Sequence, residues 1–242
     1  MNNDFYVGYL SKAPSSLAKW LKRILSAVML GGLAVGVLLI FDQSPFAASK
    51  FEYGVYREYS GIIEDWPYPT LRTADTAYLL VAPGKHGFSE AGKLQGRGVH
   101  LQGALIERGP DHMLEVLPAS LKEISALPIP PLVKPISLGT VRLRGEIADS
   151  KCYLGVMNPG NGKVHRDCAV RCISGGAPPV FVARDASGET QVLLLVGSDG
   201  RALNREVLSF VAEPVEISGE VVRSGSNLIL KADPSRFRRD SE

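Results

Sequence analysis

The residues after position 50 contain one sequence pattern twice, and this internal repeat constrains the fold more than any local propensity does. Short apolar segments of the first copy match segments of the second copy in the same order. The matched pairs are residues 61–65 with 145–149, 78–81 with 193–196, and 99–108 with 215–224. A duplicated pattern of this length predicts two small domains of the same architecture.

Each copy is predicted to be a small β-barrel. Its apolar runs are short, rich in β-branched residues and bounded by Gly, Pro, Asp or Asn, which is typical of strands joined by hairpins. Gly103 and Gly219 lie in the middle of matching runs, where a bend or bulge lets a small sheet close on itself. About five bent strands per copy indicate an OB-like barrel, with a sandwich or an SH3-like barrel as alternatives.

These patterns divide the chain into segments. The two barrels are expected at residues 50–126 and 138–233, and the stretch 51–59 could supply the first strand of the first barrel. The intervening segment 127–137 is rich in proline, which predicts a stiff linker. The tail, residues 234–242, is expected to fray.

The two copies differ in the distance between their first two matched segments. Gly61 and Tyr78 are 17 positions apart, whereas Gly145 and Leu193 are 48 positions apart. The additional residues, assigned to an insert at 150–182, contain all three cysteines of the chain. An insertion in one copy of a duplicated scaffold is a usual place for added function, because the barrel can fold without it. A site is therefore expected in the second copy alone.

The insert contains a possible ligand set for a metal ion. A short helix is expected from about Val164 to Ile173, and it would carry His165, Cys168 and Cys172 at positions i, i+3 and i+7 on one face. Three thiols and one imidazole form a complete tetrahedral set for zinc, and sulfur donors suit cuprous copper equally well. The predicted ligands are Cys152, His165, Cys168 and Cys172, with Asp149 as a partner that orients the imidazole.

Two other interpretations of the cysteines stay open. Outside the cytoplasm, Cys152 could form a disulfide with Cys168 or Cys172 and fasten the insert to its barrel, which leaves one thiol over. A bond between Cys168 and Cys172 is disfavoured, because their side chains are parallel on the expected helix. The third interpretation is a redox-active thiol pair, whose thiolates would be favoured by the nearby basic residues Lys163, Arg166 and Arg171.

The spacing of these residues resembles a signature found in small, poorly characterised bacterial exported proteins. The pattern is Asp149-x-x-Cys152, a loop with glycines, His165-x-x-Cys168-Ala169-x-x-Cys172, and then Gly-Gly-x-Pro-Pro. It covers about 30 residues of the insert. The resemblance implies an exported bacterial protein in which the cysteines and the histidine act as a unit, and it supplies no reaction.

The segment 24–41 is apolar throughout and has about the minimum length for one crossing of a bilayer. Basic residues gather on its amino side, so residues 1–23 are expected in the cytoplasm and the barrels in the periplasm of a bacterial inner membrane. A cleaved signal peptide is the alternative, but its apolar core is usually shorter. The expected partners are therefore the lipid bilayer, through residues 24–41, and another membrane protein.

The net charge of +2 comes from residues 1–23, which carry four basic residues and one acidic residue. The barrels show neither a basic stripe nor a run of aromatic residues, which argues against a nucleic-acid partner. No recognisable catalytic set is present, so an enzyme is disfavoured. The sequence therefore favours a membrane-anchored metal-binding accessory protein or subunit. A disulfide-stapled assembly subunit and a thiol–disulfide oxidoreductase are the alternatives.

Overall fold

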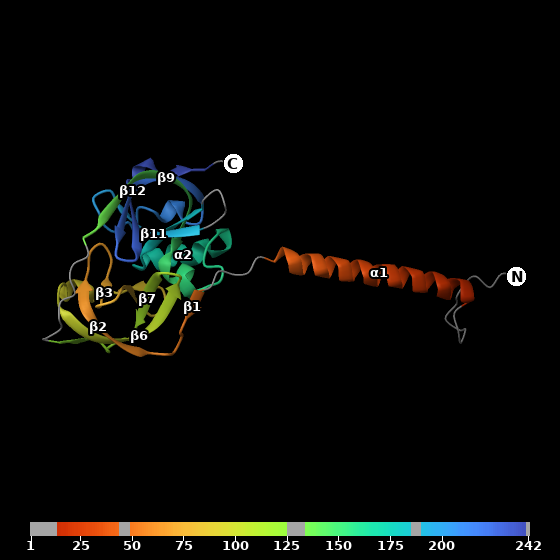
Figure 1. Ribbon diagram of the computed structural model, residues 1–242, viewed down its shortest axis with the longest axis horizontal. Coiled ribbons are helices and arrows are strands. Elements are labelled where there is room, and N and C mark those ends of the chain that lie inside the picture. Colours follow the sequence, from red (N-terminus) through yellow and green to blue (C-terminus); the bar gives the residue numbers. More distant parts are fainter. Residues whose placement is uncertain (1–13, 44–48, 125–133, 185–189, 241–242) are drawn as a thin grey trace. The chain divides into compact units, whose positions relative to one another are not determined.

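The computed structural model describes residues 14–43, 49–124, 134–184 and 190–240 (Figure 1). The chain divides into two compact units, Met1–Phe46 and Ala47–Glu242. The first unit contains helix α1 (Ser15–Asp42), in which no residue is buried. This helix includes the predicted apolar segment 24–41 and is long and apolar enough to cross a membrane. A helix of this kind near the N-terminus is either a membrane anchor or a signal sequence.

The second unit contains two barrels of five strands each, as predicted. The first barrel consists of β2 (Arg57–Glu64), β3 (Thr70–Arg72), β4 (Ala77–Ala82), β6 (Gly98–Arg108) and β7 (Asp111–Val116). It closes in the order β2-β3-β4-β7-β6-β2, and β4 and β7 are its parallel pair. Short elements join it: β1 (Ser49–Phe51), β5 (His86–Gly87), η1 (Ala91–Lys93) and β8 (Lys122–Glu123).

The second barrel repeats this topology strand for strand. Its strands are β9 (Ile136–Asp149), β10 (Pro179–Arg184), β11 (Thr190–Gly197), β12 (Pro214–Ser224) and β13 (Asn227–Ala232). They close in the order β9-β10-β11-β13-β12-β9, again with one parallel pair, β11 and β13. Short turns η4 (Leu208–Phe210) and η5 (Pro234–Arg236) and the strand β14 (Arg238–Arg239) complete it. The matched sequence segments thus occupy equivalent strands.

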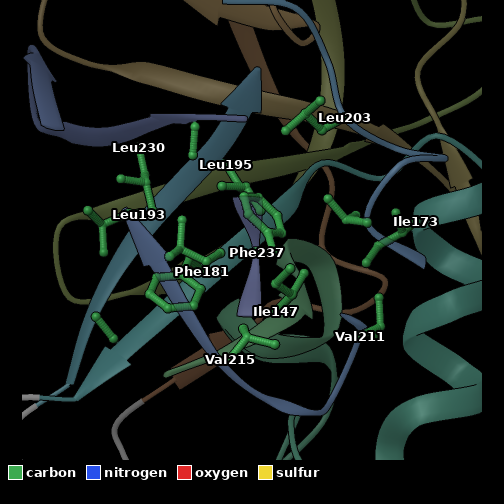
Figure 2. Packing of buried hydrophobic residues seen from close by; sticks show 14 of the residues in the cluster. Ile147, Ile173, Phe181, Leu193, Leu195, Leu203, Val211, Val215, Leu230 and Phe237 are labelled. Carbon is green, nitrogen blue, oxygen red and sulfur yellow. The ribbon is translucent and has the colours of Figure 1, made fainter. Parts of the chain in front are cut away.

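The alternation of apolar and polar residues decides which strand faces fill the barrels. In β12, Val215 and Ile217 point inward and are fully buried, while Glu216 between them is not. Inside the second barrel they meet Phe181, Leu195 and Leu230, which are also fully buried (Figure 2). Burying one such side chain contributes about 1.5–3 kcal/mol. This interior packing is the main stabilisation of each barrel.

The predicted glycines lie where one long strand exchanges partners. Gly219 of β12 pairs with Val141 of β9 on one side and with Ala232 of β13 on the other. A Cβ at Gly219 would lie 2.4 Å from the carbonyl oxygen of Lys231, so no larger residue fits this close approach. Gly103 is the equivalent residue of β6 and is in contact with β2 and β7.

Four details of the predicted boundaries differ from the structure. The stretch 51–59 is not one strand: β1 ends at Phe51 and β2 begins at Arg57. The insert ends before residue 182, because strand β10 already begins at Pro179. The tail does not fray directly after Asp233, since β14 pairs with β12. Most of the predicted linker 127–137 lies outside the described residues, and β9 already begins at Ile136.

The two barrels share buried surface. One cluster of buried residues includes Leu79, Ile106 and Met113 of the first barrel together with Val180 and Leu194 of the second. Tyr68 of the first barrel is buried there as well. Its hydroxyl group donates a hydrogen bond to the carbonyl oxygen of Leu195 (2.9 Å) and accepts one from the amide of Leu203 (2.9 Å). The barrels are therefore one packed body and not two domains on a tether.

Candidate metal centre

The insert begins where strand β9 ends, at Asp149, and its two ends are held together. The amide of Ser150 donates a hydrogen bond to the carbonyl oxygen of Pro178 (3.0 Å), directly before β10. A π-helical turn, η2 (Cys152–Val156), follows and is buried at Cys152, Tyr153 and Leu154. This anchoring places Cys152 at the base of the insert, close to the end of β9, as the sequence predicted.

A short turn, η3 (Lys163–His165), leads into helix α2 (Arg166–Ser174). The helix begins at Arg166, two residues later than predicted, so His165 precedes the helix and Cys168 and Cys172 lie on it. Ala169, Cys172 and Ile173 are buried on one face, while Arg166, Asp167 and Arg171 are exposed on the other. The amides of Gly175, Gly176 and Ala177 donate to the carbonyls of the last turn and end the helix there.

The structure brings the three cysteines together. Their Sγ atoms lie within 4.8 Å of one another, and all three are free thiols. Cys152 and Cys172 are buried, whereas Cys168 is partly exposed. The Sγ atoms of Cys152 and Cys168 are 4.0 Å apart. Three sulfur donors at this separation could hold one metal ion.

His165 joins a second group that shares Cys152 with the first. One donor atom each of Asp149, Cys152 and His165 lies within 4.8 Å of the others, and all three residues are buried. The Nε2 atom of His165 is 3.1 Å from Oδ2 of Asp149, and the other carboxylate oxygen accepts the Cys152 amide hydrogen at 2.8 Å. Asp149 therefore holds the imidazole beside Cys152, as predicted, whereas the imidazole is not grouped with all three thiols.

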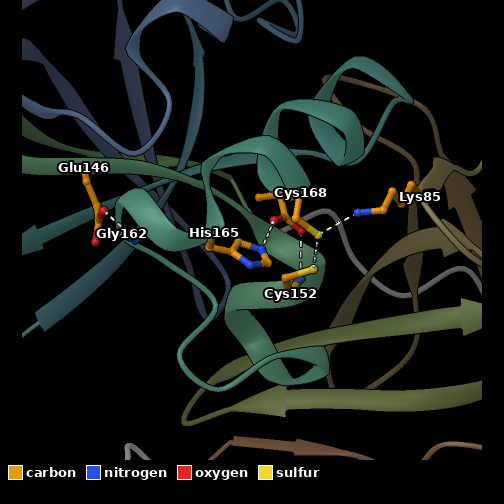
Figure 3. Close-up of polar contacts among 7 residues, drawn as sticks. Lys85, Glu146, Cys152, Gly162, His165 and Cys168 are labelled. Carbon is orange, nitrogen blue, oxygen red and sulfur yellow. Dashed lines mark hydrogen bonds and ion pairs between the residues drawn. The ribbon is translucent and has the colours of Figure 1, made fainter.

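A residue of the first barrel also reaches the thiols. The Nζ atom of Lys85 donates a hydrogen bond to Sγ of Cys168 at 2.7 Å (Figure 3). Lys85 lies in the turn between β4 and β5, 83 positions before Cys168. This contact brings a residue of the first copy to the cluster, although the cysteines and the histidine themselves all lie in the second copy. The cause is the packing of the insert against both barrels.

Hydrogen bonding sets the direction of the thiol pKa values. The Cys152 thiol donates to Cys172, and this bond together with burial raises the pKa of Cys152. Accepting the same bond lowers the pKa of Cys172. The bond to Cys168 raises the pKa of Lys85, because the sulfur stabilises the ammonium form. Within this cluster the pKa of Cys172 is thus shifted down and that of Cys152 is shifted up.

Two further residues of the insert, Lys151 and Gly175, hold the turn of the first barrel that carries Lys85. The Nζ atom of Lys151 donates to the carbonyl oxygens of Ala82 (2.8 Å) and Gly84 (2.7 Å) and pairs with Glu115 at 2.6 Å. The carbonyl oxygen of Gly175 accepts the amide hydrogen of Gly87 at 2.9 Å. Both side chains of the Lys151–Glu115 ion pair are buried. The thiol cluster is consequently fixed to this turn from both sides.

Sequence reasoning missed Lys85, Lys151 and Glu115. Each is an ordinary charged residue without a motif around it, and no local signal distinguishes it from a surface residue. The sequence analysis instead proposed Lys163, Arg166 and Arg171 as the basic neighbours of the thiols. Arg166, for example, pairs with Glu213 at 2.9 Å.

Comparisons with known protein families and with curated proteins found no match to this chain. The structure accordingly supports two small closed barrels with a buried Cys/His cluster, and no family is assigned.

Proposed function

We propose that this chain is a membrane-anchored extracytoplasmic protein that holds a zinc or copper ion in its second barrel, and that it serves a membrane complex as an accessory protein or subunit. The observation that carries the proposal is the meeting of three free thiols within 4.8 Å of one another in a buried part of the insert. Buried free thiols at this distance are typical of a metal site.

Cys152, Cys168 and Cys172 are the proposed sulfur ligands, and His165 is the proposed fourth ligand. The contact between His165 and Asp149 supports this role, since a histidine that binds a metal usually has a carboxylate on its other ring nitrogen. The chemistry of the set also fits, because soft sulfur donors retain zinc and cuprous copper against other biological metals. A metal held in this way would supply structural stability.

The proposed location rests on helix α1. Its segment 24–41 is apolar and unburied, and basic residues precede this segment in the sequence, which supports insertion in a bacterial inner membrane with residues 1–23 in the cytoplasm. The barrels then lie in the periplasm. In that compartment, cysteines that are not bound to metal are exposed to oxidation.

Elemental analysis tests the metal site. The full chain, purified in detergent with a reductant present, is expected to contain one zinc or copper ion per chain, whereas Cys168→Ser is expected to contain substoichiometric metal. His165→Gln should bind the metal more weakly, by about 10- to 100-fold if the imidazole supports the site. The matched control is His100→Gln, because His100 is in the first barrel and contacts Ser60 instead. Wild-type protein without bound metal would contradict the proposal.

A disulfide-stapled assembly subunit is the second candidate, because the Cys152 and Cys168 sulfurs are only 4.0 Å apart. Oxidation of this pair would fasten α2 to the base of the insert. Intact-mass measurement of protein prepared without reductant distinguishes the two candidates. Loss of two hydrogens together with absence of metal indicates the disulfide, and an unchanged mass with bound metal indicates the metal site.

A further inference from the structure

Lys85 lies at the solvent side of the thiol cluster. Of the three cysteines, Cys168 is the one that is partly exposed, and the ammonium group of Lys85 contacts its sulfur at 2.7 Å. The side chain extends from the first barrel toward α2, which carries Cys168 (Figure 3). Cys152 and Cys172, in contrast, are buried.

The charges of a loaded site explain why a cation is needed there. Three thiolates leave a net negative charge when they bind one zinc ion, and a larger one when they bind cuprous copper. Negative charge in a largely buried cluster is unfavourable unless hydrogen bonds or an opposite charge offset it. Among the described residues, Lys85 is a basic side chain that donates a hydrogen bond to a cysteine sulfur.

We infer that Lys85 of the first barrel is a positioning residue of the metal site, where its ammonium group offsets the charge of the thiolates and orients Cys168. This inference rests on the proposed function. It makes the site a joint product of both barrels, although all of the metal ligands come from the second.

The surrounding backbone supports this role. Lys85 cannot drift freely from α2, because its own carbonyl oxygen lies against Gly175, where a Cβ would approach it to 2.0 Å. The neighbouring Gly87 amide is bonded to the Gly175 carbonyl, and Lys151 holds the carbonyls of Ala82 and Gly84. The turn is thus held in place before any metal binds.

The test measures zinc affinity of the full chain in detergent by competition with a chromophoric chelator, at low and at high salt. Lys85→Met is expected to bind zinc about tenfold more weakly than wild type, which is the lower end of the usual effect of removing such a supporting partner. Lys85→Glu is expected to bind more weakly still. Because Lys85 is exposed, added salt should screen its charge. The difference in zinc affinity between wild type and each Lys85 variant should therefore be smaller at high salt.

Lys93→Met is the matched control, since Lys93 is an exposed lysine elsewhere in the first barrel. Its zinc affinity should equal that of wild type. Thermal unfolding of the metal-free proteins checks that each variant is folded. If wild type binds zinc and both Lys85 variants bind it equally well at low salt, the inference is wrong while the metal site stands. If wild type binds no metal, both are wrong.

Discussion

Asp149 is the residue on which the geometry of the centre depends most directly. Its carboxylate is fully buried, and its two oxygens have different partners: one accepts the amide hydrogen of Cys152, and the other faces the imidazole of His165. Because Asp149 is also the last residue of β9, the same side chain joins the rigid barrel to the insert. The positions of a thiol and an imidazole are thereby fixed from one point of the backbone.

Asp111, in contrast, is a carboxyl that the fold buries only in part. It begins β7, and burial raises its pKa to about 6 from 3.8. Between these two pH values the folded protein retains the proton that the unfolded chain releases, so stability falls as the pH rises through this window. The amide side chain in Asp111→Asn is neutral at every pH, so this variant should not lose stability as the pH rises through the window. Urea-unfolding midpoints measured across the window check the prediction.

Asp75→Asn is a suitable control for Asp111→Asn, because Asp75 is exposed in the turn between β3 and β4. Its unfolding midpoints should follow those of wild type at each pH. If the unfolding midpoints of wild type and Asp111→Asn change with pH in the same way, the Asp111 carboxyl is hydrated in solution. That result would contradict the expected effect of burial on its pKa.

At the scale of elements, the end of α2 is where the insert meets the first barrel. Gly175 leaves no space for a side chain, since a Cβ would lie 2.0 Å from the carbonyl oxygen of Lys85. Gly175→Ala should therefore push the turn between β4 and β5 away from α2 and lower the free energy of unfolding by about 1–3 kcal/mol, the usual effect of overpacking. Chemical denaturation of the full chain in detergent measures this loss.

The matched control for Gly175→Ala is Ser174→Ala at the preceding, exposed position. It adds no bulk against the first barrel and should change stability by less than about 0.5 kcal/mol. Similar stability for the two variants would mean that the close contact between α2 and the turn does not persist in solution.

At the scale of the whole molecule, the buried ion pair between Lys151 and Glu115 joins the insert to the first barrel at 2.6 Å. Lys151→Met leaves the Glu115 carboxylate buried and unpaired, together with the carbonyls of Ala82 and Gly84. The free energy of unfolding should fall by about 3–5 kcal/mol, as it does when one partner of a buried pair is removed. Chemical denaturation measures the loss.

The double variant Lys151→Met with Glu115→Gln provides the internal control, because it removes both charges. It should be more stable than Lys151→Met alone, since no unpaired charge is then buried. Lys122→Met, at an exposed position of β8, should leave stability unchanged. A double variant as unstable as the single one would attribute the loss to packing instead of charge.

The sequence by itself determined the parts of this protein that depend on local patterns. Alternating apolar residues specify the strands, the repeated order of segments specifies two barrels of one topology, and the apolar run near the N-terminus specifies a long helix. The convergence of Cys152, Cys168 and Cys172 was also predictable, because helical spacing places two of them on α2 and the end of β9 places the third. These features depend on neighbours a few positions apart or on one barrel at a time.

Only the tertiary structure decided how the two barrels meet and what that contact adds to the centre. Lys85 and Cys168 are 83 positions apart, and Tyr68 and Leu195 are 127 apart. No periodicity or motif relates residues at such separations. Their contact arises from apolar surface that neither barrel buries alone, so the lysine at the thiols is a consequence of packing between two copies of one fold.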